Sequence, residues 1–206
     1  MIFATHFFSV LLLVFGAQDT AKASTLNPLE RLAAKVSVES VASADISRLA
    51  GHYVNPPTDL VRRIGGVLSG DDLYLFADGT FIYCQWSDIQ PLTIYDKGQW
   101  TFANGAVELK SAPDVTWDPE ADRTYIAVRR RSHRKEILLV GLRSDLPRFE
   151  QEARDDPESM LLIVSKERKA ALTLAEGKKV KARLLRESWH PGDYKTKPTD
   201  HDKPHN

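Results

Sequence analysis

Short apolar runs in the middle of the chain are separated by two-residue sequences that are typical of tight turns. Residues 72–77 and 80–86 flank Asp78-Gly79, which favours a hairpin turn because both residues adopt positive φ at low cost. Since apolar residues fill both alternating positions, we expect both faces of this hairpin to be covered. Counting outward from a two-residue turn pairs Phe76 with Phe81, Leu75 with Ile82, Tyr74 with Tyr83 and Leu73 with Cys84.

This register places four aromatic side chains on one face of the hairpin, namely Tyr74, Phe76, Phe81 and Tyr83. Such a face is too apolar to lie in water, so it either packs into the core beneath a helix such as 27–42 or lines a ligand pocket. Both interpretations are open at this point, and the four residues are the candidate ligand-binding residues.

A second turn dipeptide, Asn104-Gly105, predicts a hairpin with one wet face. It sets Phe102 opposite Val107 and Trp100 opposite Leu109 on the apolar face. Residues 123–129 and 136–142 indicate a third hairpin, which is joined by a strongly basic loop.

Further elements follow from caps and periodicity. Asn27 and Pro28 can begin a helix over 27–42, and Ser144 or Asp145 can begin a short helix near 145–154. Other segments read as a helical turn at 45–49 and strands at 52–54, 92–95, 160–164 and 180–184. The predicted fold is mainly β: an antiparallel up-and-down barrel or sandwich of about eight strands, with an N-terminal helix and that one short helix.

The N-terminus indicates export. An apolar run over 7–17 has the length of a signal-peptide core, and Ala21-Lys22-Ala23 provides a small-residue cleavage site before Ser24. An uncleaved anchor is the alternative, because the n-region lacks Lys and Arg. The expected organisation is a signal peptide over 1–23, a helical segment over 24–50, a β-barrel-like domain over 51–188 and a disordered tail over 189–206, in a periplasmic or secreted protein.

Cys84 is the single cysteine, so no disulfide forms within the chain and the exported domain depends on burial for its stability. A nucleophilic or redox role would need a neighbouring base or cation. The predicted register puts Cys84 among aliphatic residues instead, which favours an inert, buried thiol.

Charge is balanced overall, with 28 basic and 28 acidic residues, but it is unevenly distributed. Residues 51–122 carry 4 basic and 11 acidic side chains, and residues 123–206 carry 20 basic and 13 acidic ones. The neutral total argues against extensive nucleic-acid binding. The basic loop supplies the candidate anion-binding residues, which are Arg129, Arg130, Arg131, Arg134 and Lys135.

Such a cluster suits an anionic lipid, a glycan or an acidic protein, and a solvated loop is the alternative. Motifs for zinc hydrolases, serine hydrolases, paired-cysteine metal sites and phosphate-binding loops are absent from the sequence. We therefore expect no catalytic residue, metal or cofactor, and we favour a non-enzymatic protein over an enzyme.

Three short segments, 51–53, 78–81 and 98–100, together with the helical turn before Gly51, resemble the lipocalin-like barrels of exported proteins. The resemblance covers about residues 46–110, with Tyr53 where lipocalins carry tryptophan. It implies a barrel whose floor is covered by an arginine, for which Arg183 and Arg186 are the candidates, and whose lumen carries a hydrophobic ligand.

The expected function is therefore an exported, non-enzymatic binding module for a small apolar or amphipathic ligand or an envelope partner. The alternative is a structural or accessory protein that docks an acidic macromolecule through the basic hairpin tip.

Overall fold

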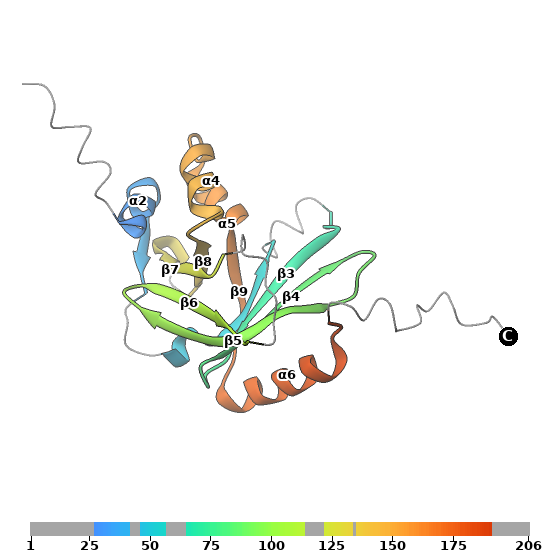
Figure 1. Ribbon diagram of the computed structural model, residues 1–206. Helices are drawn as coiled ribbons and strands as arrows, with labels where there is room; N and C mark the ends of the chain where they lie inside the picture. Colours follow the sequence, from blue (N-terminus) through green and yellow to red (C-terminus); the bar gives the residue numbers. More distant parts are fainter. Residues whose placement is uncertain (1–26, 42–45, 57–64, 114–121, 134, 191–206) are drawn as a thin grey trace, which may run out of the picture.

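Eight antiparallel strands form a closed barrel in the computed structural model, which describes residues 27–41, 46–56, 65–113, 122–133 and 135–190 (Figure 1). Each strand pairs with the next along the chain, and the last pairs with the first. The predicted mainly β fold class is confirmed, and of its two predicted forms, an up-and-down barrel or a sandwich, the barrel is the one present. The strands are β2 (Gly51–Asn55), β3 (Ser69–Leu75), β4 (Thr80–Ser87), β5 (Thr93–Ala103), β6 (Ala106–Ser111), β7 (Thr124–Arg130), β8 (Leu138–Gly141) and β9 (Ser165–Ala171).

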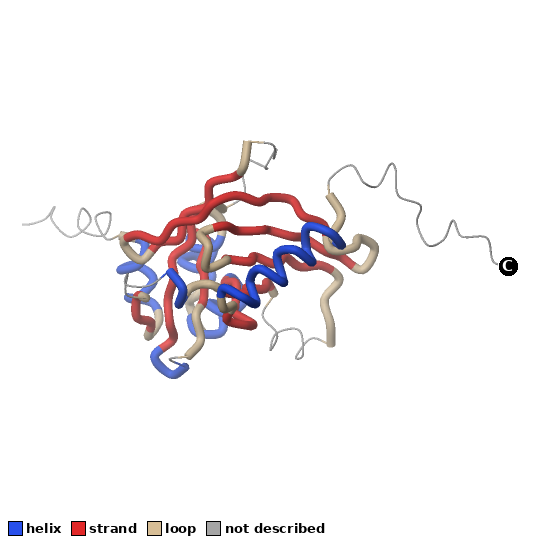
Figure 2. Tube along the Cα trace, turned by 90° about the horizontal axis from the view of Figure 1, so that it is seen from below, coloured by secondary structure: helices blue, strands red, loops and turns tan. Residues whose placement is uncertain are grey.

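A ninth strand and several helices surround the barrel. Strand β1 (Val38–Ser40) pairs with β7 outside the barrel. Figure 1 shows α2, α4 and α5 on one side, near β7 and β8, and Figure 2 shows α6 lying across the strands on another side. None of the helices described is long and apolar enough to cross a membrane. The helical elements are α2 (Pro28–Lys35), η1 (Ile46–Arg48), η2 (Arg131–His133), α4 (Asp145–Glu152), α5 (Pro157–Val164) and α6 (Leu174–Glu187).

Apolar side chains are buried in three clusters. One fills the barrel interior and includes Leu73, Trp100 and Leu139. The second joins α2, α4 and α5 to the outer side of β7 and β8, and the third lies between α6 and the outer side of β3, β4 and β5. The outer faces of these strands carry apolar residues, and the helices pack against them and shield them from water.

The first predicted turn is correct in position but wrong in type. The Phe76 N–H donates to the Thr80 carbonyl at 2.8 Å, so the loop holds three residues and the register shifts by one. The Asp78 carboxylate accepts the Thr80 N–H at 3.0 Å, and Gly79 has φ of +80°. A glycine with positive φ after a turn is the usual three-residue alternative to the two-residue turn.

The shift separates the four aromatic residues that were predicted to share a face, because a one-residue slip moves every side chain to the other side. Strand pairing now sets Leu75 opposite Phe81 and Leu73 opposite Tyr83, and these four residues face the barrel interior. Tyr74, Phe76, Ile82 and Cys84 face outward instead, beneath α6.

The Asn104-Gly105 turn has the predicted two-residue form, with φ of 53° and 80°. Its predicted pairs, including Trp100 opposite Leu109, are confirmed. The third hairpin, the helical turn before β2 and the short helix α4 are also present as predicted. The strand segment 92–95 belongs to β5, which continues through Gly98.

Two predicted strands are wrong, and the predicted N-terminal helix is present but shorter than expected. Residues 160–164 and 180–184 are helical, because Asp156 caps α5 and Thr173 caps α6 with side-chain hydrogen bonds that alternation did not reveal. The helix predicted over 27–42 ends at Lys35, and residues 38–40 form β1 instead. The signal-peptide prediction lies outside the described residues, as does the predicted tail beyond residue 190.

One end of the barrel, here called the floor, lies next to η1. The Tyr53 hydroxyl donates to the Leu49 carbonyl at 2.8 Å, and Arg168 donates to the Arg48 carbonyl at 2.6 Å. Arg168 of β9 therefore lies at the floor, and the expectation that Arg183 or Arg186 would lie there is wrong. Those two arginines lie on α6, outside the barrel.

Candidate functional site

The mouth of the barrel is the end opposite the floor, where β2, β4 and β8 finish and β3, β7 and β9 begin. A cavity of about 250 Å³ opens there. The hollow next to it, of about 360 Å³, shares Asn55 and Asp71 with it. The cavity is lined by Asn55, Asp71, Tyr83, Asp122, Tyr125, Ser144, Asp145, Arg148, Ile163, Val164 and Lys166.

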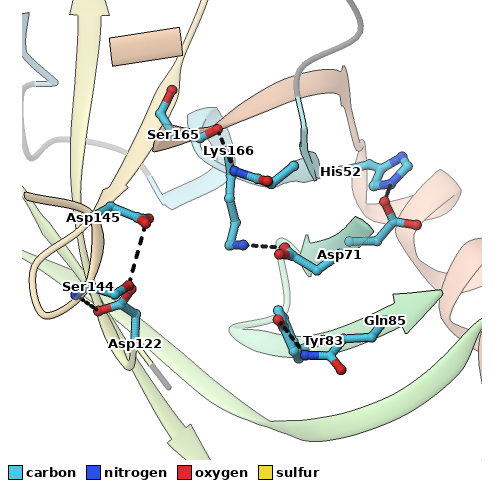
Figure 3. A network of polar contacts seen from close by, with 11 residues as sticks. His52, Asp71, Tyr83, Gln85, Asp122, Ser144, Asp145, Ser165 and Lys166 are labelled. Carbon is cyan, nitrogen blue, oxygen red and sulfur yellow. Dashed lines mark hydrogen bonds and ion pairs between the residues drawn. The ribbon is translucent and has the colours of Figure 1, made fainter. Parts of the chain in front are cut away.

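Lys166 is the most deeply placed charge in this cavity, with only 6% of its surface exposed. It enters from β9 and forms an ion pair with Asp71 of β3 (Figure 3). Its ammonium nitrogen lies 5.5 Å from the ring centroid of Tyr83 and 5.9 Å from that of Tyr125. These distances are in the range of cation–π contacts, so both rings add to the stabilisation of the cation.

The ion pair determines the protonation state of Lys166. Burial alone would lower the pKa of this lysine, but Asp71, Tyr125 and Tyr83 together outweigh burial and raise the pKa above its ordinary value. The side chain is therefore an ammonium ion at neutral pH. An amine nucleophile needs the opposite shift, so Lys166 is suited to electrostatic binding and unsuited to covalent catalysis.

Two carboxylates face the cavity from the other side, where β8 leads into α4. Asp122 accepts the backbone N–H groups of Arg143 and Ser144 at 2.8 and 3.1 Å, and it also accepts the Ser144 hydroxyl. These three bonds hold the Asp122 carboxylate in place. Figure 3 shows Asp122, Ser144 and Asp145 as a group facing Lys166 and Asp71.

Asp145, the first residue of α4, is the second of these carboxylates. The pKa of Asp145 is raised to about 6, chiefly by burial, while Lys166 opposes the rise and the neighbouring Asp122 contributes to it. Gly141 permits this arrangement, because a Cβ atom at that position would collide with the Asp122 and Asp145 carboxylates. Strand β8 therefore ends in glycine because a larger residue would displace the carboxylates of the cavity.

The predicted aromatic ligand-binding set is divided between two places. Tyr83 lines the cavity, and Phe81 is buried inside the barrel. Tyr74 and Phe76 pack beneath α6, where the Phe76 ring lies close to Gly177. The prediction that all four share one face is wrong, for the reason of register given above.

The predicted anion-binding residues also separate. Arg130 forms an ion pair with Glu136 at 2.7 Å, and Arg129 follows the inward-facing Tyr125 and Ala127 on β7 and interacts with Tyr53 near the floor. Arg131 and Lys135 are exposed, and Arg134 lies outside the described residues. The described residues therefore do not present the five cations as one surface, and anion binding there stays a prediction.

Cys84 is buried as predicted, although its neighbours are Tyr74 and Ile82 on the outer face. Burial raises the pKa of its thiol above the ordinary value, which favours the unreactive protonated form. Across the described part of the chain, three or more His, Cys, Asp or Glu side chains never gather in a group that could hold a metal ion.

Apart from Tyr83, the residues that line the cavity were not among the predicted ligand-binding residues. Lys166 lies in a stretch with three cations among five residues, which reads as a solvated surface and gave no sign of a strand. Asp122 and Asp145 are 23 positions apart and meet only because β7 and β8 pair. Comparisons with protein-family models, curated proteins and solved structures find no match for the chain.

Proposed function

We propose that the protein is a non-enzymatic binding module, related in architecture to the lipocalin-like barrels, whose ligand enters the mouth and contacts the Lys166 cavity. The observation that carries this proposal is the cavity itself: space of about 250 Å³ remains at the mouth, whereas side chains fill the interior below it. Small-molecule sites are concave and place a few polar groups against apolar walls.

The ligand is small and has a polar end. Trp100 and Leu73 fill the barrel below the cavity, with 2% and 0% of their surfaces exposed, so a long hydrophobic molecule has no lumen to occupy. Ile163 and Val164 give the cavity one apolar wall, and charged groups form much of the remainder. This lining fits the amphipathic ligand of the sequence-based expectation better than the purely apolar one.

Binding is also the use that the chemistry of the charged groups favours. Lys166 is an ammonium ion paired with Asp71, and three hydrogen bonds hold the Asp122 carboxylate in place. Groups fixed in this way preorganise a site, which reduces the free-energy cost of ordering it around a ligand.

Native mass spectrometry of protein purified from its own source tests the proposal, because a retained small molecule adds directly to the mass. Ser144→Trp should block the cavity and abolish the adduct. Ser132→Trp is the matched control, since Ser132 is also exposed but lies in η2, away from the cavity. An adduct retained equally by both variants, or absent from the wild type as well, contradicts the proposal.

Export remains part of the proposal and has its own test. The signal sequence predicts that secreted material begins at Ser24. The intact mass of the exported protein measures this directly, and a membrane-bound form that retains Met1 would show the segment to be an anchor.

A further inference from the structure

We propose that the ligand of the mouth cavity is a small organic cation, such as a primary amine, whose charged group lies against Asp122 and Asp145. This inference rests on the proposed function and adds the chemical class of the ligand. It follows from the charge balance of the cavity, from the positions of its two aromatic rings and from the groups that an anion would have to face.

Acidic groups outnumber basic ones in the cavity. Asp71, Asp122 and Asp145 face a single buried ammonium, that of Lys166. All four groups interact electrostatically, since Lys166 stabilises the ionised form of Asp145 while the two other carboxylates disfavour it. Asp71 already neutralises Lys166 through their ion pair, so Asp122 and Asp145 are left as the uncompensated negative charges.

The remaining cation in the lining does not correct this imbalance. The Arg148 side chain is 57% exposed and forms an ion pair with Glu152 at 3.3 Å, one turn along α4. Its charge is therefore both screened by water and shared with a carboxylate outside the cavity. A positive group on a ligand would therefore be attracted to the Asp122 and Asp145 carboxylates.

The cavity also suits an organic ion better than a bare metal ion. Calcium takes six to eight oxygen ligands, and no metal-binding group of three or more side chains is found in the ranges that the structure describes. Tyr83 and Tyr125 present ring faces that already attract the Lys166 ammonium, and Ile163 adds an apolar wall. An amine attached to a small hydrocarbon group can use all of these surfaces.

An anionic ligand meets the opposite situation. It would have to displace Asp71 from Lys166, which leaves a buried carboxylate without its partner, and it would lie near two further carboxylates. The Asp145 carboxyl adds a separate sign of the same preference. Its pKa is raised to about 6, so the free protein holds an anion that burial disfavours and that a bound cation would stabilise.

The experiment compares three probes of nearly equal size and different charge: 2-phenylethylamine, 3-phenylpropionate and 2-phenylethanol. Chemical-shift titrations of the backbone amides of Ser144, Asp145 and Lys166 at pH 7.5 report binding at the cavity. We expect the amine alone to shift these signals in a saturable way. Asp145→Asn should weaken amine binding about tenfold, which corresponds to the loss of about 1.4 kcal/mol.

Asp155→Asn is the matched control, because Asp155 is exposed and lies outside the cavity lining, in the turn between α4 and α5. It should leave the amine affinity unchanged. Saturable shifts from the propionate or the alcohol, without shifts from the amine, overturn the cationic ligand and leave the binding function standing. Absence of shifts from all three probes overturns the ligand class proposed here, while the mass-spectrometric adduct decides the binding function independently.

Discussion

Replacement of Asp145 by asparagine should make the protein more stable at alkaline pH. In the folded protein the pKa of this carboxyl rises from its ordinary 3.8 to about 6, chiefly because of burial. Between these two values the folded state binds more protons than the unfolded state, so this group lowers stability as the pH rises through that window. Above pH 6 the whole destabilisation is present, and below pH 3.8 it is absent.

The magnitude follows from the size of the shift. About two pKa units at 1.36 kcal/mol each give about 3 kcal/mol as an upper figure. Asp145 is the first residue of α4, where a carboxylate gains about 0.3 to 1 kcal/mol from the helix dipole, and its partial exposure reduces the figure further. We therefore expect Asp145→Asn to raise the free energy of unfolding by about 1 to 2 kcal/mol at pH 8.

Urea unfolding at pH 8 and at pH 4.5 measures this effect. The gain of the variant over the wild type should shrink at pH 4.5, where the folded wild type already holds the proton on Asp145. Asp155→Asn, at an exposed position, should show no gain at either pH. Equal stability of wild type and Asp145→Asn at pH 8, or a gain that does not depend on pH, would refute the reasoning.

Three further predictions concern the fold. Gly79→Val should lower the free energy of unfolding by about 1 to 3 kcal/mol, because Gly79 has φ of +80°; an unchanged melting temperature would show that the turn tolerates a β-branched residue. Cys84 should react with a thiol reagent far more slowly in native protein than in urea, and equal rates would contradict its burial. Leu184→Ala should lower the free energy of unfolding by about 2 to 5 kcal/mol, because Leu184 packs α6 against the barrel. Leu185→Ala, at a position 43% exposed, should leave the stability nearly unchanged in the same thermal melts. Similar losses of stability in the two variants would contradict the packing of α6.

Some of these predictions follow from the sequence alone, and others need the structure. The turn glycines and the burial of Cys84 follow from local sequence, since positive φ and apolar alternation depend on a few neighbouring residues. The register of the first hairpin could not be predicted from the local sequence, because Asp78-Gly79 is compatible with loops of two or three residues. The choice between them depends on the hydrogen bonds of Thr80 and on which face the barrel covers.

The sequence by itself determined that this chain is a mainly β domain of antiparallel hairpins, because turn dipeptides and alternating apolar residues specify hairpins locally. It left a barrel and a sandwich open, and the pairing of β9 with β2 closes the sheet into a barrel. Tertiary structure decided which polar segments enter that barrel. Strand β9 carries four charged residues in a row, Lys166, Glu167, Arg168 and Lys169. It is a strand only because β2 and β8 supply hydrogen-bonding partners on both sides. Since closure of the barrel buries Lys166 and brings Asp122 and Asp145 to its mouth, the candidate site exists only in three dimensions, where residues distant in sequence share one low-dielectric cavity.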